Sequence, residues 1–188
     1  MSRITMFGDS ALLAPLWMLL LVWSATFDRR LALRWATVVG CAMLILVASK
    51  LFYASTGIAL EGGRFRVISG HTALSFSVWP VFAFLVFQAR PRAAYLAVAI
   101  AVIFSGLVGY SRVQIGAHTP LEVVAGLLLG GGVSGTFFIF WARSHHRSLG
   151  YLRWPFIASS TLLISICYGY QAPVDKWIGF VGQWISVP

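Results

Sequence analysis

The sequence predicts an all-α fold, a polytopic membrane helix bundle of about six transmembrane helices followed by a short C-terminal interfacial helix. Of its 188 residues, 59% are hydrophobic and only 10% are charged, which leaves too little polar surface to coat a soluble globule. The apolar residues gather in runs of the length that a helix needs to cross ~30 Å of hydrocarbon. Short breaks that carry Arg or Gly separate these runs, as loops between transmembrane helices do.

Six apolar runs account for the predicted crossings. The first contains Trp17 and Trp23, and Arg3 alone supplies positive charge ahead of it, which favours a retained helix over a cleaved signal peptide. No repeat or long linker divides the chain, so residues 1–188 are expected to form one domain with its motifs in a core at 50–130. The predicted spans are 11–27, 33–54, 70–87, 93–110, 119–142 and 155–171.

The fifth run carries a stripe of glycines, for which close packing between membrane helices is the expected reason. These are Gly126, Gly130, Gly131, Gly132 and Gly135.

The tail after Pro173 places large apolar residues at helical spacing, and its tryptophans predict a helix along the outer membrane interface. A role for this helix in guiding lipid to a site is a second interpretation. The spaced residues are Trp177, Ile178, Val181, Trp184 and Ile185.

Basic residues cluster in the breaks after the first, third and fifth runs, and the positive-inside rule places this face in the cytoplasm. The opposite face receives both termini and the breaks 55–69 and 111–118. Because the basic residues sit at run ends without a nucleic-acid module, the pI of about 10.4 reflects membrane topology, and no nucleic-acid partner is expected. His145 and His146 are expected to be solvated loop residues. The clusters are Arg29, Arg30 and Arg34, then Arg90 and Arg92, then Arg143, Arg147 and Arg153.

Polar residues gather at the run ends on the opposite face, all on one side of the membrane at one depth, which predicts a site. Its cations and a helix N-terminus near Gly70 favour an anion. Phosphate fits because Arg offers a planar fork to two oxygens and Lys a point charge. No carboxylates cluster there as Mg²⁺ requires, so neither a metal nor a cofactor is predicted. The candidate phosphate-binding residues are Lys50, Arg64, Arg66, Ser69, Gly70, Ser111 and Arg112.

Two histidines, His71 and His118, belong to the same predicted site. Imidazole can act as a nucleophile or carry a proton near neutral pH. Phosphoryl transfer needs an attacking atom on one side of phosphorus and a proton for the leaving oxygen on the other. Glu122 lies four residues after His118, so on one helix face its carboxylate can reach the imidazole and orient it.

Three stretches resemble the signature of the type 2 phosphatidic acid phosphatase superfamily. They are Lys50, "ISGH" at 68–71 and "SRVQIGAH" at 111–118, and the resemblance covers roughly residues 50–130. It implies a helical, metal-independent phosphatase that works through a phosphohistidine.

Matched by position, the resemblance makes His118 the nucleophile and His71 the acid that protonates the leaving group. It places Lys50, Ser69, Gly70 and Arg112 in the phosphate cradle, and Glu122 stands where an Asp is usual.

The first motif departs from the family pattern. The family has Lys, six residues and then Arg-Pro, whereas this chain has Gly57 and Ile58 at that spacing. Arg64 or Arg66 is expected to substitute from a longer loop. In the second motif Ile68 replaces the usual Pro.

These observations together predict a membrane lipid phosphatase in a bacterial inner (cytoplasmic) membrane, with its site facing the periplasm or cell exterior. Undecaprenyl pyrophosphate is the first expected substrate. Phosphatidylglycerophosphate, phosphatidate and lipid A phosphates remain open, as does phosphoryl transfer to another lipid. The alternative of another class is a non-catalytic protein that binds or transports lipid phosphates. The expected partners are the lipid substrate and the bilayer, with no obligate protein partner.

Overall fold

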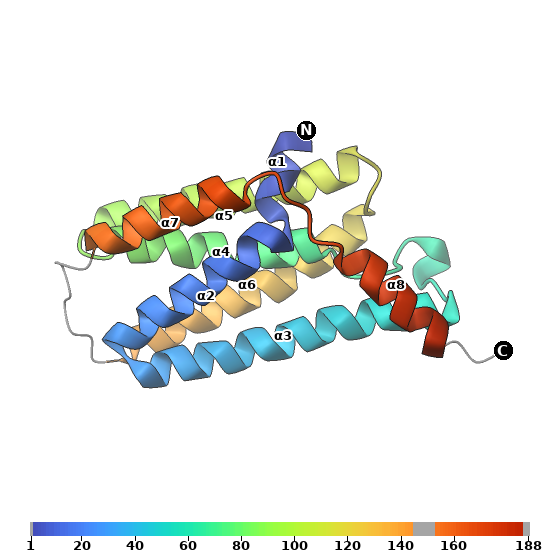
Figure 1. Cartoon of the computed structure of the whole chain (residues 1–188), viewed down its shortest axis with the longest axis horizontal. Coiled ribbons are helices and arrows are strands. Elements are labelled where there is room, and N and C mark those ends of the chain that lie inside the picture. Colours follow the sequence, from blue (N-terminus) through green and yellow to red (C-terminus); the bar gives the residue numbers. More distant parts are fainter. Residues whose placement is uncertain (1, 145–152, 186–188) are drawn as a thin grey trace.

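The structure, a computed structural model, describes residues 2–144 and 153–185 as a bundle of helices (Figure 1). His145 and His146 therefore lie outside the described residues. The all-α prediction is confirmed. In chain order the helices are α1 (Ser2–Thr5), η1 (Met6–Gly8), α2 (Ser10–Phe27), α3 (Arg29–Thr56), η2 (Glu61–Gly63), α4 (Gly70–Phe87), α5 (Pro91–Gln114), α6 (Pro120–Ala142), α7 (Arg153–Cys167) and α8 (Val174–Ile185).

Within the described residues, five helical segments are long and apolar enough to cross a membrane, so the chain is a multi-pass membrane protein. The sixth predicted span is shorter than expected, because α7 has 15 residues and reaches only ~22 Å at ~1.5 Å per residue. The chain leaves the helix at Cys167 and turns at Gly169, whose φ is 94°. The five segments are Arg3–Phe27, Arg29–Thr56, Gly70–Phe87, Pro91–Gln114 and Pro120–Ala142.

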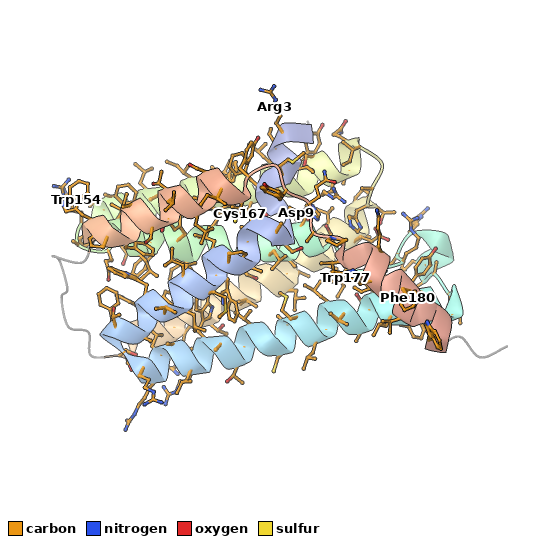
Figure 2. All side chains as sticks on the ribbon, viewed as in Figure 1. Arg3, Asp9, Trp154, Cys167, Trp177 and Phe180 are labelled. Atoms are coloured by element: carbon orange, nitrogen blue, oxygen red, sulfur yellow. The ribbon has the colours of Figure 1, made fainter. Side chains whose placement is uncertain are left out.

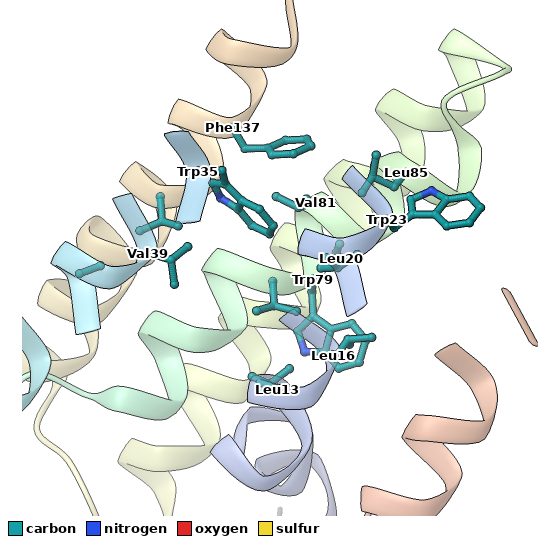
Figure 3. Packing of buried hydrophobic residues seen from close by; sticks show 14 of the residues in the cluster. Leu13, Leu16, Leu20, Trp23, Trp35, Val39, Trp79, Val81, Leu85 and Phe137 are labelled. Atoms are coloured by element: carbon teal, nitrogen blue, oxygen red, sulfur yellow. The ribbon is translucent and has the colours of Figure 1, made fainter. Parts of the chain in front are cut away.

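Helix α2 contributes several residues to the apolar core, so the first predicted run is an integral part of the bundle. Its Leu13, Leu16 and Leu20 are fully buried, and Trp35 of α3 packs edge-on against Phe137 of α6 with ring centroids 5.0 Å apart (Figure 3). Because lipid tails are as apolar as these side chains, their close van der Waals packing, and not removal from water, stabilises the contacts between the helices.

The two ends of the bundle differ in character. The α3–α4 and α5–α6 connections lie at one end, where α8 crosses the C-terminal part of α3 (Figure 1). The α2–α3 and α4–α5 turns, with Arg29 and Arg90, lie at the other end. On α8, Trp177 and Phe180 are exposed (Figure 2), as expected for a helix at the membrane interface.

Only part of the glycine stripe makes close contacts. A Cβ atom on Gly126 would come within 2.6 Å of the Ser69 carbonyl oxygen, and one on Gly130 would collide with the Ala73 carbonyl. These two glycines therefore let α6 pack directly against the backbone of α4. By contrast, a Cβ atom on Gly132 would meet nothing within 4 Å.

We expect Gly130→Ala to destabilise the protein, because overpacking a tight contact costs about 1–3 kcal/mol. Gly132→Ala is the matched control on the same helix, and it should be neutral or slightly stabilising because Ala favours helix over Gly by ~1 kcal/mol. Thermal unfolding in detergent measures both. Equal midpoints for the two variants would contradict the packing assignment.

Candidate active site

Four segments far apart in the sequence bring the predicted site residues together. Lys50 lies near the C-terminal end of α3, Arg66 in the connection to α4, Arg112 in the last turn of α5, and His118 just before α6. Because the helices alternate in direction, all these positions meet at the end of the bundle crossed by α8.

The carboxylate of Glu122 organises this end of the bundle. It is fully buried, and its Oε1 accepts hydrogen bonds from the backbone N–H groups of Arg66 at 2.8 Å and Val67 at 3.4 Å. Its Oε2 accepts from the Thr119 N–H at 3.1 Å and contacts His118 Nδ1 at 2.8 Å. Glu122 therefore docks the α3–α4 connection on α6 and holds the imidazole at the same time.

A capping box starts α6 and sets this geometry. The Thr119 side chain accepts from the Glu122 N–H while the Glu122 side chain accepts from the Thr119 N–H, which satisfies two free donors of the first turn reciprocally. The Glu122 backbone carbonyl also accepts from the Ser69 N–H at 3.1 Å. The two motif-bearing helix starts are thus bonded directly to each other.

The orientation of His118 suits a nucleophile. With Nδ1 against the carboxylate, the tautomer that carries its proton on Nδ1 keeps a lone pair on Nε2. Burial lowers the pKa of His118 below its ordinary 6.5, the hydrogen bond to Glu122 opposes this shift, and the positive charges of Arg112 and Lys50 reinforce it. The neutral, attacking form is therefore favoured at neutral pH.

A cavity of about 410 Å³ opens beside His118. Its walls include the cationic side chains of Lys50, Arg66 and Arg112, together with Ile178 of α8. Arg66 also reaches Glu122, with Nε 3.5 Å from Oε1. A concave site with three cations and a histidine is chemically suited to an anionic phosphate group.

A second, smaller cavity of about 180 Å³ shares Lys50 with the first, so this side chain lines both cavities. Gly70 and His71 line the second cavity. The Lys50 Nζ is 3.8 Å from the position that a Cβ atom on Gly70 would occupy, so the ammonium group sits at the N-terminus of α4. The Ser69 side chain makes no capping hydrogen bond there.

The remaining predicted residues lie away from both cavity walls. The Ser111 hydroxyl is buried against the Thr5 hydroxyl and the Val108 carbonyl, each at 2.6 Å, where α1 packs on α5. The buried Ser69 hydroxyl bonds to Thr72 at 2.9 Å. Arg64 is exposed and offers its backbone carbonyl to Thr119. Between the two candidate loop arginines, Arg66 is thus the one that lines the cavity.

Sequence reasoning missed Asp9, whose Oδ2 lies 3.6 Å from His71 Nε2. Its side chain is almost completely buried and lies beside the segment that connects α7 to α8 (Figure 2). The one available signal was an acid in an otherwise apolar run, where "GDS" precedes an apolar helix. That pattern predicts a helix cap and gives no hint of a distant histidine.

Among the described residues, no group of three or more His, Cys, Asp or Glu side chains could hold a metal ion. The carboxylates near the site lie against one histidine each. The metal-free mechanism stays a prediction.

Comparison with known proteins identifies the family. The family model described as the PAP2 superfamily matches residues 49–147, which include every residue that lines the larger cavity except Ile178. The chain is 34% identical to a Klebsiella pneumoniae protein named "Uncharacterized 22.5 kDa protein in cps region", over 94% of this chain and 87% of that protein. It is 40% identical over 73 residues to the bacitracin transport permease protein BcrC of Bacillus licheniformis, over 39% of this chain and 31% of that one. No solved structure matches. Because the family model covers more than half of the chain, this chain belongs to the PAP2 superfamily.

Proposed function

We propose that the protein is a metal-independent membrane lipid phosphatase that forms a phosphohistidine on His118. The observation that carries the proposal is the His118–Glu122 pair at 2.8 Å, set beside a cavity lined by three cations. Members of the PAP2 superfamily are generally phosphatases, which supports the same conclusion. The residues to which the family signature assigns chemistry are also those that the fold gathers at one end of the bundle.

The proposed reaction has two steps. First, the Nε2 lone pair of His118 forms a bond to phosphorus while the bond from phosphorus to the leaving oxygen breaks, and His71 gives that oxygen a proton. Second, water attacks phosphorus and gives a proton to His71, and the bond between nitrogen and phosphorus breaks. The net change is hydrolysis of the ester or anhydride to the dephosphorylated lipid and inorganic phosphate.

Charge stabilisation is assigned to Lys50, Arg66 and Arg112. Negative charge spreads over the phosphoryl oxygens in the transition state, and positioned cations near an apolar boundary stabilise it with little screening. The N-terminus of α4 adds backbone N–H donors at Gly70.

The cavity beside His71 supports a lipid as the leaving group. In-line displacement places the leaving oxygen opposite the attacking His118, and we assign that side to His71, which lines the neighbouring cavity. The walls there include Met43, Leu46 and Leu74, which suit an apolar chain. The headgroup would then occupy the cationic cavity, and the tail would leave it past His71.

Within this class we propose undecaprenyl pyrophosphate as the substrate, with the site at the periplasmic or outer face of a bacterial inner membrane. Three cations around one cavity favour a headgroup with more than one phosphate. The arginine-rich turns at the opposite end of the bundle support this orientation.

A substrate panel tests the proposal. Purified protein in detergent is offered undecaprenyl pyrophosphate, phosphatidylglycerophosphate, phosphatidate and lipid A, each with EDTA and with added Mg²⁺. We expect phosphate release in EDTA, fastest from undecaprenyl pyrophosphate. A strict requirement for Mg²⁺ would overturn the metal-free mechanism. Transfer of a labelled phosphate from the substrate to a second lipid would identify a phosphotransferase instead.

The name of the Bacillus licheniformis relative, a bacitracin transport permease, keeps a transport function as the alternative. A transporter would bind lipid phosphates or move them between the leaflets of proteoliposomes without releasing phosphate. The same panel, read for phosphate release and for accessibility of the lipid headgroup on each leaflet, separates the two functions.

A further inference from the structure

Asp9 joins three parts of the fold through one carboxylate. Its Oδ1 accepts the N–H of Ala11 at 2.8 Å, which caps α2, and the N–H of Ala172 at 3.0 Å, which belongs to the segment leading to α8. Its Oδ2 lies 3.6 Å from His71 Nε2. The whole residue is only 6% exposed, so the negative charge is held away from water.

The capping role does not account for the second oxygen. Asp28 caps α3 at the opposite end of the bundle, and there too a single Oδ1 makes both backbone bonds, to Arg30 at 2.8 Å and Leu31 at 3.2 Å. A cap therefore needs one oxygen. At Asp9 the remaining oxygen is directed at a histidine that the family signature makes catalytic.

Gly8, which precedes Asp9, packs closely against the same histidine, His71. A Cβ atom on Gly8 would lie 2.6 Å from Val108 Cγ1 and 3.1 Å from His71 Cβ. Glycine thus lets η1 pack against the side of His71, and this contact fixes the position from which Asp9 extends. Residues 8 and 9 also lie outside the matched family region 49–147, so they are supplied by the N-terminal segment of this chain.

We propose that Asp9 is the positioning residue for His71, which it orients to act as the acid for the leaving oxygen. This inference rests on the proposed phosphatase function. A buried carboxylate next to an imidazole stabilises its protonated form. With Nε2–H toward Asp9, His71 delivers the proton on Nδ1 to the leaving oxygen and regains one there from the attacking water. Each histidine of the site would then have its own carboxylate, Glu122 for His118 and Asp9 for His71.

Asp9→Asn tests the proposal because Asn is an equally good helix cap and its amide oxygen can still accept both backbone N–H groups. The variant loses the charge and places an amide N–H where a carboxylate oxygen faced His71 Nε2, while the cap is kept. Two substrates report on the acid: octyl phosphate, whose alkoxide needs a proton to leave, and p-nitrophenyl phosphate, whose phenolate leaves without one. We expect the first-turnover rate of octanol release to fall ~10-fold or more, within the ~10²–10⁴ that a general acid supplies, and the first-turnover rate of p-nitrophenolate release, which reports only the step that needs no acid, to change little.

Three matched variants complete the experiment. His71→Gln should show the same loss of rate on octyl phosphate and not on p-nitrophenyl phosphate. Adding Asp9→Asn to His71→Gln should cause no further loss, because the effects of residues that act through one another are not additive. Asp28→Asn, the equivalent cap at the other end of the bundle, should leave both rates unchanged.

The outcomes separate this inference from the proposed function. If wild type hydrolyses the substrates and His71→Gln is selective while Asp9→Asn behaves as wild type, the positioning role is overturned and the phosphatase stands. Equal losses on both substrates with a lowered unfolding midpoint would assign Asp9 to the cap alone. If wild type releases no phosphate from any substrate, both proposals fail.

Discussion

Replacing His118 with alanine should reduce phosphate release by ~10⁴-fold or more, because loss of the nucleophile removes the covalent route entirely. The side chain is partly buried, with its Nδ1 held by Glu122, and the substitution leaves a small polar cavity without breaking a helix. Release of inorganic phosphate from the best lipid substrate measures the effect. A thermal unfolding curve in the same detergent shows that the variant is folded.

A trapping experiment assigns the covalent role directly. With a radiolabelled substrate quenched during turnover, wild type should carry acid-labile label that is stable to base, as a phosphorus–nitrogen bond is. His118→Ala should carry none. His71→Gln with p-nitrophenyl phosphate is the informative control, since its first step needs no acid and its second step lacks a base, so label should accumulate. Substantial phosphate release by His118→Ala would exclude His118 as the nucleophile.

The arrangement of the helices was largely predictable because it depends on local sequence. Apolar runs between breaks define the long helices within a few residues, as at 70–87, where the predicted span and α4 coincide. The alternation of membrane helices then assigns each break to one end of the bundle. The last predicted span was too long at its C-terminal end, because the chain turns at Gly169 after α7 ends at Cys167. A hydropathy profile does not detect a turn of this kind.

Within the site, the pairs set by a short sequence separation were predictable and the others were not. The contact of Glu122 with His118 follows from a four-residue spacing on one helix. Whether Arg64 or Arg66 faces the cavity depends on how the α3–α4 connection docks, and the two Glu122 bonds to its backbone decide this. No spacing rule reports such a contact. Asp9, the partner of His71, could not be predicted either, because it lies far from His71 in the sequence and no spacing rule connects the two.

Glu122→Gln should keep the fold and lower kcat by ~10²–10⁴-fold. The amide preserves the shape and one acceptor oxygen, but it removes the charge that stabilises the cation formed when His118 attacks. An amide N–H facing Nδ1 also favours the wrong tautomer, with the proton on Nε2 and no lone pair there. In a well-studied serine protease the equivalent Asp→Asn change costs ~10⁴ in kcat for this reason. Phosphate release and the yield of trapped phosphoenzyme should fall together, since both depend on the first step.

Glu122→Ala should instead damage the structure, and the contrast between the two variants separates the two roles of this carboxylate. Alanine leaves the N–H groups of Arg66, Val67 and Thr119 without their buried acceptor, at ~1–3 kcal/mol for each donor that water cannot reach. The unfolding midpoint should drop well below that of Glu122→Gln, and the α3–α4 connection should become sensitive to protease. If Glu122→Gln retained wild-type turnover while Glu122→Ala unfolded, the carboxylate would serve only to dock the connection, and the orientation of His118 would have to come from elsewhere in the site.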